Sequence, residues 1–141
     1  MASDDAFTLL QGYLEQHWNN AGVRLVWPNE RDTELPPRPF IYLDIESGED
    51  DLASIGAAEP RDNLWREAGW LAATVLVEQG EGTRQARQIR DQLAEIFRGL
   101  SIGPLRCRAM SRSRGEAWES EGWGNLYGLP LIVNWELDVT P

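Results

Sequence analysis

The stretch LWREAGWLAATVLVEQ, residues 64–79, is the longest strand candidate in the chain and decides the predicted fold. From Trp70 to Val77, both faces of such a strand are largely apolar. A strand that is apolar on both faces is typical of a central position in a sheet covered on both sides. A GEGT turn follows and leads into an amphipathic segment after Thr83. The sequence therefore predicts a central strand that runs through a short turn into a helix.

Two amphipathic segments are predicted to form the main helices. Near the N-terminus, Asp4 and Asp5 precede apolar residues spaced three to four apart, as on a helix with acidic residues at its positive end. A second stripe of this kind follows Thr83, a residue type that caps helix N-termini. The other strand-like segments are residues 23–27, 40–46, 104–114 and 126–139.

This order of elements predicts a single domain over residues 1–141. Its class is α+β, with a mixed, mostly antiparallel sheet of about five strands and two main helices packed on one face. The acidic, glycine-containing segments 46–63 and 116–125 are expected to form a loop or hairpin tip and a turn, respectively. Pro130 cannot donate a ladder hydrogen bond, so we expect it at a sheet edge or a bulge.

Composition argues against several classes of function. The 141 residues carry a net charge of −10, which disfavours nonspecific DNA binding by the whole surface. The chain contains one histidine, His17, and one cysteine, Cys107, too few for a His/Cys metal cluster, and we expect no cofactor. No apolar run is long enough for a membrane span. The acidic N-terminus is unlike a secretory signal, so we expect synthesis in the cytoplasm.

All thirteen basic side chains are arginines, and several of them lie along one predicted strand. In RCRAMSRSR, Arg106, Arg108, Arg112 and Arg114 would share one face at the strand period of two. Such a row can meet carboxylates of another copy, remain solvated or face passing DNA, and the pattern leaves these alternatives open. The segments ESGEDD and EAWESE supply candidate acidic partners, among them Glu46, Glu49, Asp50 and Asp51.

Two further regions are candidates for contacts with partners. The segment NERDTEL lies between prolines, which reduce the entropy that a loop loses on binding. Its residues Glu30, Arg31 and Asp32 are therefore predicted to belong either to a contact arm or to a plain solvated loop. In the second acidic segment, Trp118 and Trp123 are candidates for apolar anchors that bind a partner, or else they cover the domain's own core.

One pair of carboxylates suggests an enzymatic alternative. Asp44 and Glu46 lie two residues apart on a predicted strand, hence on one face, and paired carboxylates can hold Mg²⁺ in a nuclease. Such sites usually add a lysine, which this chain lacks, so a solvent-facing strand end is the simpler interpretation. A third interpretation, a polyproline ligand for an adaptor domain, depends on the short PPRP stretch.

Four segments, taken in order, carry a resemblance to a known family. They are FTLLQGYLEQHWNNAGVRLVWPN, PPRPFIYLDI, WREAGWLAATVLVEQGEGTRQARQIRDQLAEIF and GLPLIVNWEL, which together span nearly the whole chain. In this order they resemble the tail terminator, or tail-completion, proteins of long-tailed phages and of phage-like gene transfer agents. None of the segments is a catalytic motif. The resemblance implies a mixed sheet with helices on one side.

The resemblance also implies a structural, non-enzymatic role at the neck of a virion. Such a protein is expected to form a homo-oligomeric ring, a hexamer, that caps the head-proximal end of the tail tube, ends tube polymerisation and supports head–tail joining. The expected partners are its own copies, the tail tube protein and a head-closure or neck protein. DNA would pass through the ring without sequence-specific binding, and no membrane is involved. Another neck protein, such as a head-closure or connector component, is the alternative within virion assembly.

Overall fold

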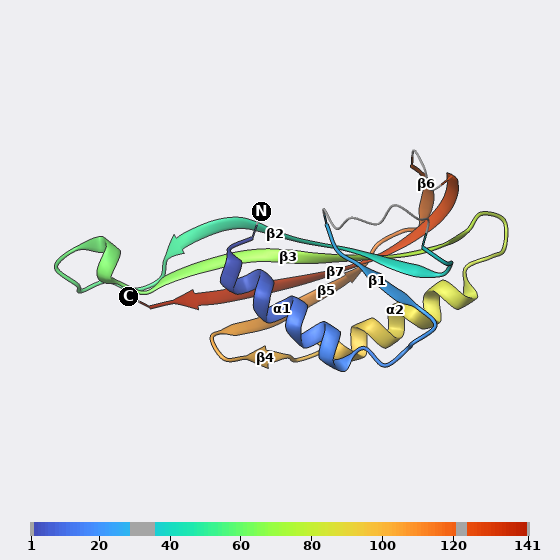
Figure 1. Ribbon diagram of the computed structural model, residues 1–141. Coiled ribbons are helices and arrows are strands. Elements are labelled where there is room, and N and C mark those ends of the chain that lie inside the picture. Colours follow the sequence, from blue (N-terminus) through green and yellow to red (C-terminus); the bar gives the residue numbers. More distant parts are fainter. Residues whose placement is uncertain (1, 29–35, 121–123, 141) are drawn as a thin grey trace.

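The computed structural model describes residues 2–28, 36–120 and 124–140, apart from the side chains of residues 119 and 120. These residues form two helices, a short 3-10 helix and the strands of one sheet, and Figure 1 shows how the elements are arranged. In chain order they are α1 (Asp4–His17), β1 (Arg24–Val26), β2 (Phe40–Leu52), η1 (Pro60–Asp62), β3 (Trp65–Glu78), α2 (Arg84–Phe97), β4 (Ser101–Ile102), β5 (Leu105–Arg112), β6 (Glu116–Ser120) and β7 (Gly124–Val139). Neither helix of the described segments has both the length and the apolar character that a membrane span requires.

The strands form one curled sheet in the order β1-β2-β3-β7-β5-β4, and β6 also pairs with β7 (Figure 1). β1 and β2 are parallel, whereas the remaining pairs of neighbouring strands are antiparallel. The predicted mixed, mostly antiparallel sheet is therefore confirmed. All the expected strands are present, and the short strands β4 and β6 bring the sheet to seven strands within the described residues.

Both helices pack on the same face of this sheet, as Figure 1 shows. The face is built by alternate strand residues, such as Leu71, Ala73 and Val75 of β3, which are fully buried. The two helices contribute apolar stripes to the same core, namely Ala6, Leu10, Leu14, Ala86, Ile89, Leu93, Ala94 and Phe97. The predicted helical spacing and the packing of both helices on one face are confirmed.

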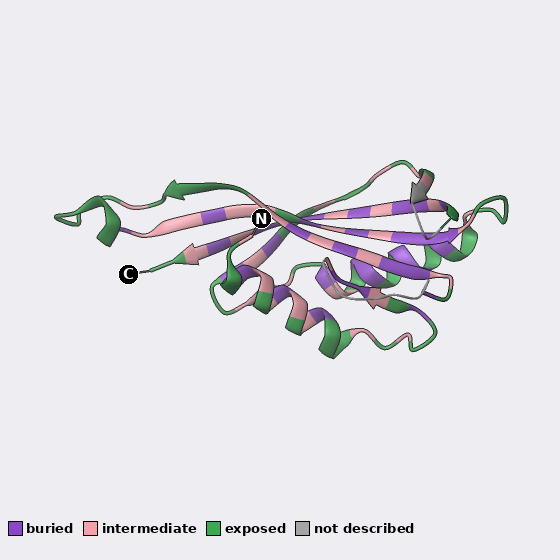
Figure 2. Ribbon diagram, turned by 45° about the horizontal axis from the view of Figure 1, so that its top comes forward, coloured by how far each residue is buried: buried purple, intermediate pink, exposed green. Residues whose placement is uncertain are grey.

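The opposite face of β3 is covered only at one end, which corrects the expectation of a strand buried on both sides. Trp70 of β3 is 40 % exposed on this face, whereas Leu76 is fully buried. The buried end carries a small second cluster, formed by Val26, Phe40, Leu76 and Leu126. No helix of the described residues packs there, so a small apolar cluster takes the place of a second layer (Figure 2).

The acidic segment after residue 46 is part of a long β-hairpin rather than a loop. β2 continues to Leu52 and pairs with β3 as far as Trp65, with a bulge between Ser47 and Glu49. The hairpin projects well beyond the two helices in Figure 1, and only the turn between its strands matches the expected tip. Glycine and acidic residues are poor strand formers, but a partner strand that satisfies the backbone hydrogen bonds outweighs this preference. The segment 116–125 is likewise mostly strand, in the β6–β7 hairpin.

Pro130 lies inside an internal strand, at a place where one ladder is interrupted. On the side of β7 away from β3, β5 pairs only as far as Leu131, and β6 takes over at Gly128. The guanidinium of Arg90 in α2, a buried residue, donates to the carbonyl of Pro130 at 3.2 Å and to that of Ser113 at 2.9 Å. Burial, with Arg112 and Arg87 nearby, lowers the pKa of Arg90. The expected edge or bulge is therefore a gap between two strands, bridged by a side chain from the helix.

A buried carboxylate fastens the start of α1 to β3. Glu67 is only 4 % exposed and accepts hydrogen bonds from the backbone N–H of Ser3, at 2.9 Å, and from its hydroxyl. The Ser3 hydroxyl oxygen accepts in turn from the N–H of Ala6, as an N-cap does. This contact lies at the place where the sheet leaves the cover of the helices.

Replacement of Gly69 by alanine tests how closely the strands approach one another at the edge of the core. A Cβ there would lie 2.1 Å from the carbonyl oxygen of Glu46 and 2.5 Å from the Trp135 ring, and the backbone atom cannot move aside. We expect Gly69→Ala to lower the free energy of unfolding in urea by about 1–3 kcal/mol. The matched control is Gly12→Ala in α1, where nothing lies within 4 Å. It should raise that free energy by about 0.5–1 kcal/mol, and equal effects of the two variants would contradict the packing described.

Candidate functional site

A bulge in β5 divides the four arginines that the sequence placed on one face. Between Cys107 and Met110, β5 contains one residue more than the facing part of β7, so the alternation of side chains shifts by one. Arg106 and Arg108 consequently lie on the face away from the helices. Arg112 lies on the helix side, where it contacts the carboxylate of Asp91 in α2 at 3.2 Å. The single row is therefore wrong, because a strict period of two does not continue through a bulge. The fourth arginine, Arg114, is exposed beyond the end of β5.

The arginines on the outer face pair with carboxylates of their own chain. Arg106 donates to Asp138 at 2.9 Å and to Glu136 at 3.0 Å, both on β7. Arg66 of β3 donates to Asp138 at 2.8 Å, and Arg108 approaches Glu136 at 3.3 Å. Hydrogen bonds from Arg106 and Arg66 lower the pKa of Asp138, and donation to Asp138 raises the pKa of Arg106. The carboxylates that contact these arginines within the chain therefore lie on β7, and not in the acidic segments named above.

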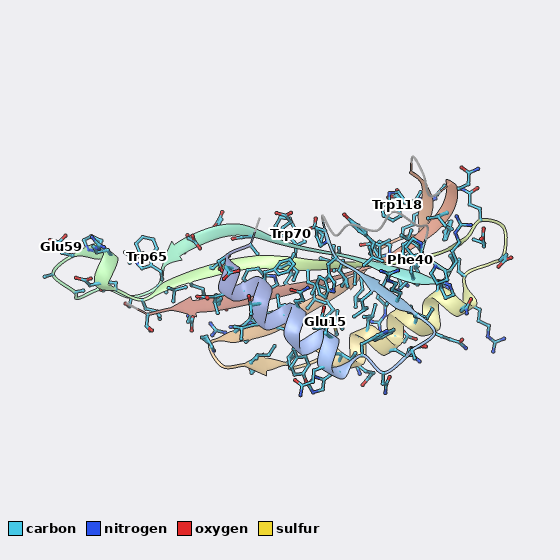
Figure 3. The ribbon with its side chains drawn as sticks, in the orientation of Figure 1. Glu15, Phe40, Glu59, Trp65, Trp70 and Trp118 are labelled. Carbon is cyan, nitrogen blue, oxygen red and sulfur yellow. The ribbon has the colours of Figure 1, made fainter. Side chains whose placement is uncertain are left out.

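An open depression of about 370 Å³ adjoins this charged group on the outer face. Trp70 is one of the residues that line it, and Figure 3 shows this side chain on the side of the sheet away from α1. Glu49 of β2 and Arg108 of β5 line it from either side, with β3 and β7 between these two strands. It combines an exposed indole with charges of both signs, a composition that suits contact with another protein surface.

The acidic end of β2 forms a separate exposed surface. Glu49, Asp50 and Asp51 lie along the projecting hairpin and are exposed (Figure 2). Leu52 is 44 % exposed and Ile55, at the tip, is 90 % exposed. These two apolar residues were not among the candidates that the sequence pattern indicated. Their position within an otherwise acidic stretch was the signal that could have identified them, since solvated acidic loops gain nothing from large apolar side chains.

Asp44 and Glu46 lie on the outer face of β2, as their spacing predicted. They face the register positions of Ala72 and Trp70 on β3. Burial, followed by the nearby carboxylate of Glu46, raises the pKa of Asp44. Within the described segments, no group of three or more Asp, Glu, His or Cys side chains is placed to hold a metal ion.

Trp118 covers part of its own domain. It is half-buried on β6, and its ring meets that of Tyr42 edge-on, with the ring centres 5.6 Å apart. Both rings pack against the small second cluster around Phe40, at the end of the molecule opposite the projecting hairpin (Figure 3). This placement favours the core-covering alternative for Trp118. Trp123 and the proposed arm residues Glu30, Arg31 and Asp32 lie outside the described residues.

Comparison with known proteins supports the fold and does not identify a family. No family model matches the chain, and no curated protein matches it. The chain is similar to the solved structure of an uncharacterised protein, with a TM-score of 0.65 and 19 % sequence identity. The match covers 100 % of this chain and 99 % of that one. At this identity, the likeness shows a common fold over the whole length and carries no statement about activity.

The ion pairs of Asp138 predict a dependence of stability on pH. Its pKa in the folded protein is below the ordinary 3.8, so its contribution is present above that pH and is lost as the pH falls through the folded value. We expect Asp138→Asn to reduce the free energy of unfolding at pH 7, with the difference from wild type shrinking below about pH 4. In an Arg106→Gln background, the same substitution should have a smaller effect at pH 7. A difference that is constant from pH 7 to pH 3 would contradict the assignment.

Proposed function

We propose that this chain is a tail terminator of a long-tailed phage or of a phage-like gene transfer agent. In this role it is a non-enzymatic virion protein that forms a ring, with six copies expected, on the head-proximal end of the tail tube. The ring ends tube polymerisation and offers its other side for head–tail joining. The family assignment is supported by the ordered resemblance along the sequence.

The observation that carries a ring-forming role is the position of two unlike charged surfaces. The acidic end of β2 lies on one side of the sheet order, and the arginines of β5 lie toward the other. A closed ring is built from heterologous contacts, in which one surface of a subunit meets a different surface of the next. A chain that carries both members of a complementary pair is suited to such contacts. Unlike surfaces also matter because six copies of net charge −10 would carry 6 × −10 = −60 in total.

The proposal assigns the remaining partners by position on the ring. One side of the ring would contact the tail tube protein, and the other a head-closure or neck protein. DNA would pass through the opening without sequence-specific binding, in keeping with the acidic character of the whole chain. The site of action would be the neck of the virion, after synthesis in the host cytoplasm.

Deletion of the gene tests this function through the length of the tails. We expect overlong tails in electron micrographs of the deletion strain, because tube polymerisation would no longer be stopped. A plasmid copy of the wild-type gene should restore the normal length. Tails of normal length that lie free beside unjoined heads would overturn the terminator role and favour a head-closure protein.

The nuclease alternative predicts a measurable activity that the terminator lacks. Asp44 and Glu46 share a face and could together contact a divalent cation, which is the observation in its favour. We expect the purified protein to leave linear and supercoiled DNA intact with Mg²⁺ or Mn²⁺. The matched control is the Asp44→Asn, Glu46→Gln variant, prepared in the same way. Cleavage by wild type that is absent from this variant would establish the nuclease.

A further inference from the structure

Two strands of the sheet have long stretches of open edge. β2 pairs with β1 only from Phe40 to Tyr42, and the N–H of Ala2 donates to the carbonyl of Ile45, but among the described residues no strand pairs with that side of residues 46–52. β5 pairs with β4 only at Leu105 and Arg106, which leaves the corresponding side of residues 108–112 open within the described chain. Open edges present N–H and C=O groups to which a strand of another chain can pair.

The two open edges carry charges of opposite sign. Glu49, Asp50 and Asp51 are exposed at the end of β2. On β5, the side chains of Arg108 and Arg112 are 58 % and 42 % exposed. Charges on an edge strand oppose pairing with an identical edge, because like charges would lie opposite one another. The same charges favour pairing of the acidic edge with the basic one, so the molecule is protected against symmetric association and suited to head-to-tail association.

Arg108 and Arg112 can each bind a second carboxylate in addition to the one that they contact within the chain. Arg108 meets Glu136 at 3.3 Å and Arg112 meets Asp91 at 3.2 Å, each through a single nitrogen. Exposed pairs of this kind contribute little to stability. A guanidinium group has five N–H donors, so each arginine can contact a carboxylate of another copy and keep its present partner.

Strand directions also fit a head-to-tail junction. Successive antiparallel pairings from β2 through β3 and β7 to β5 make β2 and β5 run in opposite directions. If β2 of one copy is placed beside β5 of another with the helices on the same face, the new pair is antiparallel, like most of the sheet. The end of β2 projects beyond both helices in Figures 1 and 2, so neither helix of its own chain stands in the way.

The short edge strands require an offset between neighbouring copies. β4 occupies the edge beside Arg106, and β1 occupies the edge of β2 up to Tyr42. Within one chain, Met110 of β5 lies level with Ile45 of β2 through their partners on β7 and β3. Pairing of β5 with the last residues of a neighbouring β2 therefore shifts that copy along the strand direction. Such a stagger is the relation that a sheet needs to curl into a closed ring.

We propose that copies of this chain associate by antiparallel pairing of the acidic edge of β2, residues 49–52, with the basic edge of β5, residues 108–112, of the next copy. The inference rests on the proposed function in one respect, since it names the subunit contact of the terminator ring. The pairing joins sheets from neighbouring copies into one and leaves all helices on the same side. It also covers Leu52, which is otherwise exposed at the edge.

Disulfide cross-linking between singly labelled proteins tests this pairing. Cys107 is buried and its pKa is raised by burial to about 11, so Cys107→Ala provides a background without the native thiol. Into it we would place Glu49→Cys on one sample, and Ala109→Cys or Ser111→Cys on the other, because all three positions lie on the outer face and the two β5 positions cover two registers in which one of them faces residue 49. Oxidation at high protein concentration should give a disulfide dimer only when the two kinds of sample are mixed.

A matched control gives the amount of dimer that forms without edge pairing. The control replaces Ala109→Cys or Ser111→Cys by Glu15→Cys, which is exposed on α1 and so belongs to neither edge strand (Figure 3). The proposal is overturned if neither β5 position exceeds this control in mixture with Glu49→Cys. It is also overturned if Glu49→Cys alone forms as much dimer as the mixture, because identical edges would then be pairing.

Charge reversal tests the electrostatic part of the proposal. Reversal of the β2 edge (Asp50→Arg, Asp51→Arg) or of the β5 edge (Arg108→Glu, Arg112→Glu) should lower the yield of mixed dimer by about tenfold or more. A mixture of the two reversed proteins should recover it, whereas Glu59→Arg with Asp62→Arg at the hairpin tip should leave it unchanged. Failure of recovery, with both proteins folded by circular dichroism, would overturn the charge pairing.

The outcomes separate this contact from the proposed function. Mixed dimers together with tails of normal length in the deletion strain would support the edge pairing and reject the terminator. Overlong tails in the deletion strain without mixed dimers would support the terminator and reject the edge pairing.

Discussion

The long antiparallel ladder between β3 and β7 is the constraint on which the rest of the structure depends. It pairs residues continuously from Trp65 with Val139 to Glu78 with Leu126. A shift of one residue would turn the apolar residues under the helices to the opposite face, so burial of that face fixes the register. The pairing of Gly69 with Trp135 adds a steric lock, because the large ring occupies the space that a side chain at residue 69 would need.

The ladder is longer than the helices that cover it, and this difference gives the molecule two unlike ends. One end contains the helical core and the small cluster around Phe40. At the other end, the hairpin of β2 and β3 projects with acidic and exposed apolar side chains, and the ion pairs around Asp138 bridge the adjoining strands. With few apolar contacts, this end depends on backbone hydrogen bonds and charge pairs, and we expect it to open before the core does.

Two local irregularities decide which side chains the surface presents. The bulge in β5 sends Arg106 and Arg108 to the outer face and Arg112 to the helix side. At the gap between β5 and β6, the backbone carbonyls of Ser113 and Pro130 accept hydrogen bonds from the guanidinium of Arg90, which comes from α2. A buried arginine is costly unless its donors find acceptors, and here one guanidinium nitrogen donates to both carbonyls and so links the helix to the interrupted ladder.

The sequence by itself determined the two helices, the principal strands and the packing of the helices on one face. Periods of 3.6 and 2 residues are local properties, and burial of an apolar stripe acts on them directly. The choice of charged and aromatic candidates was also local, and the structure describes most of them as exposed or half-buried.

Tertiary structure alone decided the length of β2, the division of the arginines and their carboxylate partners. The acidic end of β2 is a strand because β3 offers it a ladder, against its own preference. The bulge in β5 exists only in relation to β7, because it is one extra residue of β5 between two paired positions of β7. Asp138 meets Arg66 and Arg106 across strands that are distant in the chain, and no local pattern specifies such a pairing. The physical reason is common to all three, since each depends on which strand lies alongside and in what register.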